Sequence, residues 1–264
     1  MDLITHMDEN TDADFSLSSK PTFTANFISA TQLGEFEWLN HPATSPYPAT
    51  PLPLIAGTGM FRILVSDYVP NTAGWVYWRE GRLQSTVKDA RTCGVLLNTG
   101  WFFFRAAVPQ LYQKYPDKPI QLEVAATSGP VVKIAPSGAE VLWKGEVRVG
   151  VLTGEAEPPV VATIAVEMRT SASGQMQGFV FVPQVGFIGF QASVTESSVG
   201  PIDVSRFRSA LECLCAKGIV PYVNSGMAKG VKLPSVDGFR FVSPAVAFES
   251  GFFVISGNLD YSRS

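Results

Sequence analysis

A long run of alternating apolar and polar residues, between positions 120 and 194, most constrains how this chain can fold. In its clearest stretch, residues 140–151, valines occupy one parity while charged side chains occupy the other. Successive side chains of a β-strand point to opposite faces, so one face of this strand is predicted to be buried and the other solvated. Residues 160–169 are predicted to repeat the pattern. The expected buried positions are Val141, Trp143, Val147, Val149, Val151, Val160, Ala162, Ile164, Val166 and Met168.

A helical pattern precedes these strands. Residues 60–65 are predicted to form a strand that runs into Ser66 and Asp67, a favourable pair at a helix start. Pro70 is tolerated in a first helical turn, and Gly81 is suited to end the helix. The apolar stripe of this helix is Val69, Ala73, Val76 and Tyr77.

Two further helical regions are predicted. One covers residues 92–116, with breaks near Gly100 and Pro109. The other begins at residues 201–203, bends near residues 218–221 and ends at Gly226 or Gly230. The apolar stripe of this long helix is Phe207, Leu211, Leu214, Ile219 and Val223.

Two strands, residues 238–248 and 252–261, close the chain. Helix, antiparallel strands, helix and hairpin make an α+β protein, because the βαβ units of a parallel sheet are missing from the pattern.

The first 56 residues have a different character. Residues 1–15 are acidic and are predicted to form either a tail or a strand separated from its partners. The pairs Asp8-Glu9 and Asp12-Asp14 are expected to be solvated, since the pattern of an EF-hand calcium loop is missing from them. Residues 22–38 favour two strands around positions 32–34. Five prolines then follow His41, a density that neither a helix nor a central strand tolerates. The sequence therefore predicts a division into residues 1–56 (acidic tail, central-sheet strands and Pro-rich connector) and 57–264 (the main domain).

Composition excludes several classes of function. The net charge is −3 with no visible basic patch, which argues against binding nucleic acid or anionic membranes through a basic surface. Apolar residues make up 46% of the chain and charged residues 16%, yet no window of 18 residues has the character of a membrane span. The apolar surplus is therefore expected to form an unusually large core, to face a partner domain or to line a cavity for an apolar ligand.

Catalytic and metal-binding motifs are missing from the sequence. Both histidines, His6 and His41, precede the strongly patterned region, and no nucleophile elbow, Walker loop or dinucleotide fingerprint occurs. The cysteines, Cys93, Cys213 and Cys215, lack zinc-ribbon spacing and are expected to be either buried free thiols or to include a bridge from Cys93 to the long helix. The sequence predicts no enzyme, no metal site and no cofactor.

Aromatic residues cluster around the first two helical regions, at Trp75, Trp78 and the run Trp101 to Phe104. Core packing is the ordinary interpretation. An edge that enters a membrane interface is the alternative, because tryptophan favours that environment.

Several segments resemble known proteins when they are taken in order. They are SDYVPNTAG, VPQLYQKYP, IAPSGAEV, SSVGPIDV, KGVKLP and GFFVISGNLDY, spread over about two hundred residues. Each is weak alone, but their order and spacing are similar to those of the C-terminal half of the bactericidal/permeability-increasing, lipopolysaccharide-binding and plasma lipid-transfer family.

The resemblance implies a highly twisted antiparallel sheet wrapped around two long helices, with an apolar tunnel for the acyl chains of phospholipid. Part of each apolar stripe would then border lipid instead of forming an ordinary core between helix and sheet. The candidate lipid-binding residues are Ile63, Val65, Val69, Ala73, Val76, Tyr77, Phe207, Leu211, Leu214, Ile219, Val223, Phe253 and Ile255.

The resemblance also implies a setting for the chain. It predicts a secreted, extracellular lipid-binding or lipid-transfer domain in innate, antibacterial immunity, with the signal peptide and the first half of the full-length protein absent from this chain. The expected partners are phospholipid, the N-terminal half, and lipopolysaccharide or a bacterial surface through the full-length protein. In the alternative, the domain docks on a receptor or surface and its bound lipid is only structural.

Overall fold

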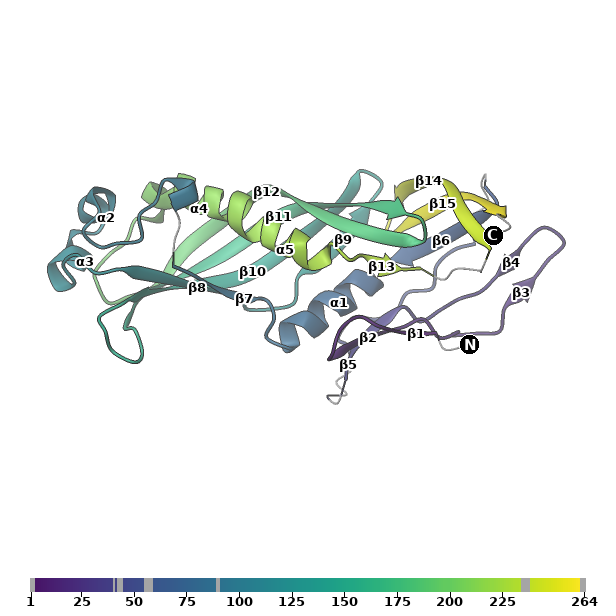
Figure 1. The fold of residues 1–264 in the computed structure, drawn as a ribbon, viewed down its shortest axis with the longest axis horizontal. Coiled ribbons are helices and arrows are strands. Elements are labelled where there is room, and N and C mark those ends of the chain that lie inside the picture. Colours follow the sequence, from purple (N-terminus) through teal and green to yellow (C-terminus); the bar gives the residue numbers. More distant parts are fainter. Residues whose placement is uncertain are drawn as a thin grey trace.

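The structure, a computed structural model, describes residues 3–39, 41, 45–54, 59–88, 91–233 and 238–261. Figure 1 shows an elongated molecule in which antiparallel strands run along the long axis and helices lie against them. The predicted α+β class with an antiparallel sheet is confirmed. The predicted boundary between residues 56 and 57 lies outside the described residues.

A seven-stranded sheet forms the centre, in the order β13-β12-β11-β10-β8-β7, with β9 paired beside β10. Its longest strands, β11 and β12, have 18 residues each and so extend for roughly 60 Å. The strands are β7 (Gln84–Val87), β8 (Ile120–Ala126), β9 (Val131–Ala135), β10 (Gly138–Val151), β11 (Val160–Gln177), β12 (Val180–Ser197) and β13 (Val231–Lys232).

Three smaller sheets surround the central one. Their orders are β1-β2-β5, β14-β15-β6 and the hairpin β3-β4. The strands are β1 (Ile4–His6), β2 (Thr11–Asp14), β3 (Thr22–Phe23), β4 (Ile28–Ser29), β5 (Glu35–Trp38), β6 (Phe61–Ser66), β14 (Phe239–Glu249) and β15 (Phe252–Tyr261).

The alternation predicted for β10 and β11 is largely confirmed. Val141, Val147 and Met168 are buried, and charged residues of the opposite parity point to solvent. Val160 is an exception: it is 46% exposed, contrary to the prediction. It is the first residue of β11 and pairs with Gly150, where a register shift interrupts the ladder with β10. The shift breaks the period on which the prediction rested.

Helices occupy most of the predicted segments, but residues 94–101, expected to be helical, form turns and bridges instead, because Gly94 with φ +68° ends the helical turn before them. The helices are α1 (Tyr68–Arg79), α2 (Phe102–Ala107), α3 (Pro109–Lys114), α4 (Arg208–Leu214) and α5 (Val220–Met227), with 3₁₀ turns at Arg91–Cys93 and Val204–Phe207. A π-helical turn, Cys215–Ile219, joins α4 to α5. Pro221 has no backbone N–H to donate to the carbonyl of residue 217, so a wider turn is favoured where the bend was predicted.

An asparagine joins each long helix to a strand. The Asn71 side chain donates from Nδ2 to the Val132 carbonyl at 3.1 Å and accepts from the Val132 N–H at 2.7 Å. Asn224 on α5 makes the same pair of bonds with Val185 of β12, at 2.9 and 2.8 Å. Each amide thereby imitates a neighbouring strand and fixes the distance between its helix and the sheet.

A disulfide joins Cys93 to Cys213, with the two Cα atoms 5.7 Å apart. The interpretation of all three cysteines as free thiols is therefore wrong, and the alternative bridge from Cys93 to the long helix is the one observed. Cys215 is a buried free thiol whose pKa is raised to about 11, chiefly by burial and secondarily by the charge of Glu212.

The N-terminal segment is not an open tail where the structure describes it. Thr11, Asp12 and Ala13 of β2 are buried, and Ala13 packs with Phe36 of β5 against α1. The acidic pairs were expected to be solvated, but Asp12 is bound by the ring Nδ1 of His6 at 2.6 Å. Acidic composition misled the prediction because pairing partners for these carboxylates come from elsewhere in the chain.

Candidate functional site

The thirteen candidate lipid-binding residues fall into separate apolar clusters. Four of them meet on adjacent strands, where Phe253 pairs with Val65 and Ile255 with Ile63. Ile255 is fully buried and Phe253 nearly so, and the two pack with Ile134, Leu233 and Phe241. These four form a closely packed core at the end of the molecule that holds β14 and β15.

The apolar stripe of α1 faces the N-terminal strands. Val69, Ala73 and the fully buried Val76 pack in one cluster with Ala13 and Phe36. Trp75 belongs to the edge of this cluster, and the Trp78 indole donates to the Ala126 carbonyl at 3.1 Å, so these tryptophans are packed as the core interpretation expected.

Tyr77 lies at the end of the α1 stripe. Burial, followed by the charge of Asp8, raises the pKa of its phenol to about 12. The guanidinium of Arg82 lies 5.7 Å from the centre of its ring.

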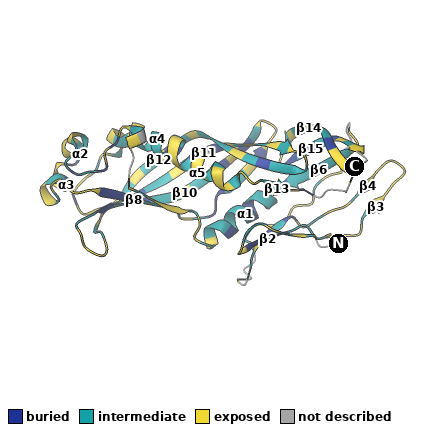
Figure 2. Ribbon diagram, viewed as in Figure 1, coloured by how far each residue is buried: buried dark blue, intermediate teal, exposed yellow. Residues whose placement is uncertain are grey.

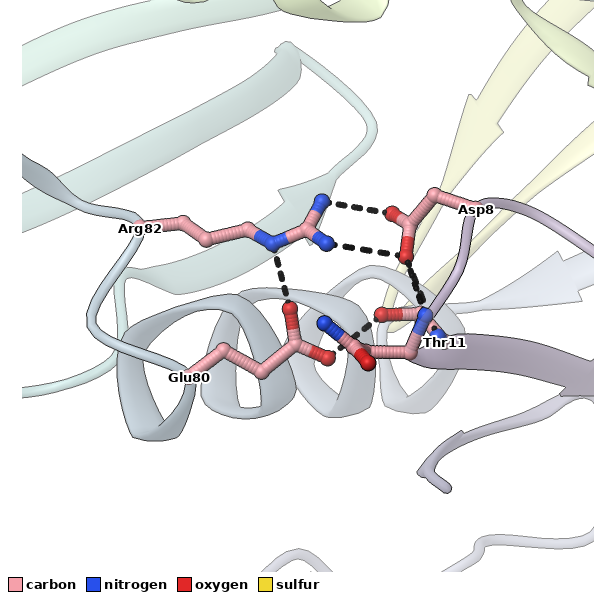
Figure 3. A network of polar contacts seen from close by, with 5 residues as sticks. Asp8, Thr11, Glu80 and Arg82 are labelled. Carbon is pink, nitrogen blue, oxygen red and sulfur yellow. Dashed lines mark hydrogen bonds and ion pairs between the residues drawn. The ribbon is translucent and has the colours of Figure 1, made fainter.

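A polar network holds the N-terminal strands on α1, as Figure 3 shows. Arg82 donates to both carboxylate oxygens of Asp8, at 2.8 and 3.1 Å, and its Nε lies 2.6 Å from Glu80 Oε2. The hydroxyl of Thr11 donates to the other oxygen of Glu80 at 2.7 Å. The Glu80 side chain is 3% exposed, and its Oε1 accepts the hydrogen bond from Thr11. Among the described residues its Oε2 has no hydrogen-bond partner, so the ion pair with Arg82 must offset the burial of this oxygen.

The long helix contributes the remaining candidates. Phe207 and Leu214 lie at the edge of the cluster around Leu111, Ile120 and Val161. Leu211 and Ile219 lie at the edge of a second cluster, described next, and Val223 is half-buried on α5.

This second cluster lies between the long helix and the strands β10 to β12. Its buried members are Met168, Phe190, Cys215 and Val220. Around them lies a larger ring of apolar side chains that are only partly covered: Trp143, Val166, Val185, Phe187, Ala192, Leu211 and Ile219. We call these eleven residues the helix–sheet cluster. Helical periodicity in the sequence identified Leu211 and Ile219, the two ring residues on the long helix. It did not identify the ring residues on β12, which are Val185, Phe187 and Ala192.

The total exposed area is large for a protein of this size. The accessible surface is 15,314 Å², whereas a compact monomer of 28.5 kDa would expose about 11,000 Å². The molecule is elongated, and the half-buried apolar side chains of the helix–sheet cluster are among the exposed surface. The arrangement is suited to covering by an apolar ligand or by another protein surface.

Two shallow hollows lie on the described surface. They have volumes of about 230 and 290 Å³ and lie along β11 and β12, one beside residues 160–163 and the other beside Glu167 and Gln191. None of the thirteen candidate residues lines either hollow.

Among the described residues, no group of three or more His, Cys, Asp or Glu side chains is arranged to hold a metal ion. None of the helices that the structure describes is long and apolar enough to cross a membrane.

Comparison with known proteins identifies relatives over nearly the whole chain. Mouse lipopolysaccharide-binding protein is 27% identical over 260 residues, covering 95% of this chain and 52% of the relative. Rat bactericidal permeability-increasing protein is 23% identical over 265 residues, covering 97% and 54%. The chain thus spans about half the length of these relatives.

The fold has a solved counterpart. A crystal structure of lipopolysaccharide binding protein superposes with a TM-score of 0.58 and 24% identity, over 99% of this chain and 57% of the other. A sequence model described as the LBP / BPI / CETP family, C-terminal domain, matches residues 5–261. The chain therefore belongs to the LBP / BPI / CETP family as a C-terminal domain of these lipid-binding proteins, and it is not an enzyme.

Proposed function

We propose that this chain is an extracellular domain that holds the acyl chains of phospholipid in apolar space between the long helix and strands β10 to β12. The helix–sheet cluster carries the proposal, because seven of its apolar side chains are only partly covered by protein. Acyl chains laid against them would bury this surface without needing any polar partner.

The energetics suit a carrier. Each methylene removed from water contributes about 0.8 kcal/mol, but a lipid that leaves a bilayer gives up a similar amount. The net preference for protein over membrane is then small, and lipid can be both taken up and released.

The remaining candidate residues belong to the same proposal. The resemblance suggested a tunnel bordered by both long helices, and the clusters containing Ile63, Val76 and Phe207 would form its walls or the packing behind them. The names of the relatives support a further part of the proposal: the full-length protein, including an N-terminal half, binds lipopolysaccharide or bacterial surfaces in antibacterial defence.

Lipid extraction and native mass spectrometry of the purified chain test the proposal. Leu211→Arg places an unpaired charge in the ring of the helix–sheet cluster and should lower the bound phospholipid at least about tenfold. Tyr222→Arg is the matched control, since Tyr222 is an exposed residue of the same long helix and should tolerate the charge. Equal lipid content in the two variants, both folded by circular dichroism, would contradict the proposal.

Exchange of the bound lipid with vesicles distinguishes a lipid carrier from a domain in which lipid is only structural. The chain should exchange its bound lipid with vesicles of deuterated phosphatidylcholine within the time of an ordinary incubation. Lipid that is present but never exchanges would favour the docking module, in which lipid only fills the fold.

A further inference from the structure

The helix α2 is an apolar element without a buried side chain. Its sequence is FFFRAA, yet none of its six residues is buried, and Phe102 is 72% exposed. Phe104 and Ala107 pack partly against the core cluster around Leu111, whereas Phe102 is not part of that cluster. Figure 2 shows α2 and α3 coloured mainly as intermediate or exposed at the end of the molecule farthest from β14 and β15.

The aromatic side chains of this end pack on one another. The Trp101 ring lies 5.3, 5.4 and 5.9 Å from the rings of Phe102, Phe103 and Phe104. Phe103 and Phe104 also contact Phe207, at 5.3 and 5.5 Å between ring centres. Phe207 thus contacts two rings of this group, and the exposed Phe102 joins the group through its contact with Trp101.

Basic residues outnumber acidic ones in the segment that forms this end. Between residues 96 and 118 the chain carries Arg105, Lys114 and Lys118 and a single acid, Asp117, although its net charge is −3. The guanidinium carbon of Arg105 lies 4.3 Å from the centre of the Tyr112 ring and the ammonium nitrogen of Lys114 lies 5.3 Å from that of Tyr115, so each charged group lies over an aromatic ring of this end.

Acidic residues also lie near this end and reduce its net positive charge. Asp203, beside the 3₁₀ turn that supplies Phe207, is paired with Arg206 at 3.6 Å. The loop after β10 carries Glu155 and Glu157, and it begins where the Leu152 N–H donates to the Pro119 carbonyl. The main contribution to binding must therefore come from the aromatic group, with the cations adding to it.

We propose that the end formed by Trp101, α2 and α3 is a docking site for a lipid bilayer, entered by Phe102 and flanked by Arg105, Lys114 and Lys118. Tryptophan and phenylalanine with adjacent basic residues are the composition that favours the interface of a membrane with anionic lipid. The centres of protein–protein contacts, in contrast, are depleted in lysine. The site is separate from the helix–sheet cluster and does not depend on lipid being held there.

Vesicle co-sedimentation of the whole chain tests the site. Wild type should bind vesicles of phosphatidylcholine containing phosphatidylserine, and more weakly vesicles of phosphatidylcholine alone. Phe102→Ser should reduce the partition coefficient about tenfold, the value of one phenyl ring withdrawn from an apolar phase. Phe23→Ser is the matched control: Phe23 is also 72% exposed, but it lies on the β3-β4 hairpin at the other end of the molecule.

A double charge-reversal variant separates the electrostatic contribution to vesicle binding from the aromatic one. Lys114→Glu combined with Lys118→Glu should weaken binding to the phosphatidylserine vesicles several-fold and change binding to phosphatidylcholine little. Lys133→Glu, at an exposed position of β9, should leave both unchanged.

Three results would overturn the proposal. They are failure of wild type to bind either kind of vesicle, equal losses for Phe102→Ser and Phe23→Ser, and unchanged binding of Phe102→Ser. The first result would instead assign this end to a protein partner. Lipid extraction from Phe102→Ser checks the separate proposal about acyl chains, because that variant should keep its bound phospholipid whatever its affinity for vesicles.

Discussion

Removing the Cys93–Cys213 disulfide should destabilise the chain strongly. The bridge closes a loop with a sequence separation of 120 residues. On the chain-entropy account, opening a loop of this size costs about 5 kcal/mol at 25 °C through the greater freedom of the unfolded chain. Total stabilities of single domains are about 5–15 kcal/mol, so this loss is a large fraction of what holds the fold together.

The double variant Cys93→Ser, Cys213→Ser tests this estimate. Because both cysteines of the bridge are replaced, neither is left as an unpaired thiol. Guanidinium unfolding, followed by tryptophan fluorescence, should show a midpoint well below that of wild type, and reducing agent should lower the wild-type midpoint toward that of the variant. Cys215→Ala is the control, since it removes a buried thiol without opening the loop and should cost only about 1–2 kcal/mol. A double variant no less stable than Cys215→Ala would refute the reasoning that loop closure provides this stability.

The three remaining predictions concern side chains that the fold uses. Asn224→Asp should destabilise the chain by about 1–3 kcal/mol in thermal unfolding, because a carboxylate cannot donate to the Val185 carbonyl; Gln113→Glu, at an exposed position, should have little effect. Arg82→Ala leaves Glu80 without its ion partner and should therefore speed chymotrypsin cleavage within residues 4–38. Adding Glu80→Gln should restore part of the resistance to the protease. A double variant that is cleaved faster than Arg82→Ala would contradict this. The raised pKa of Cys215 means that its thiol is neutral at pH 8, so iodoacetamide should label the native protein very slowly. After unfolding without reductant, iodoacetamide should label one thiol per chain. Fast labelling of the native protein would contradict the burial of Cys215.

Local patterns predicted the elements well where a short period determines the structure. The two-residue alternation of β10 identified its buried face, and Asp67 and Gly81 bracketed α1 closely. The final hairpin was also placed within a residue at each end. In these segments the information lies within a few neighbouring residues, because each local choice agrees with the fold.

Contacts between distant segments were beyond the same reasoning. The amide bonds of Asn71 and Asn224 to strand backbone, and the network that joins Asp8 to Arg82, depend on how elements pack, and nothing in the neighbouring sequence indicates the partner. Cysteine pairing has the same character, since spacing left two interpretations open. For the candidate lipid site, helical periodicity identified Leu211 and Ile219, but the half-buried residues of β12 that complete the cluster lie in a strand with several glycines and a weaker alternation.

The position of the unpaired cysteine has a consequence for how the chain reaches its native state. In the unfolded chain, Cys213 and Cys215 are nearly equivalent partners for Cys93, because a loop two residues longer has almost the same closure entropy. Only helical structure distinguishes them, since it directs Cys213 toward the 91–93 turn and Cys215 into the core. We therefore expect that residues 208–219 must form a helix before the correct disulfide can form. Oxidant added too early should trap a mispaired isomer that a disulfide isomerase can rescue.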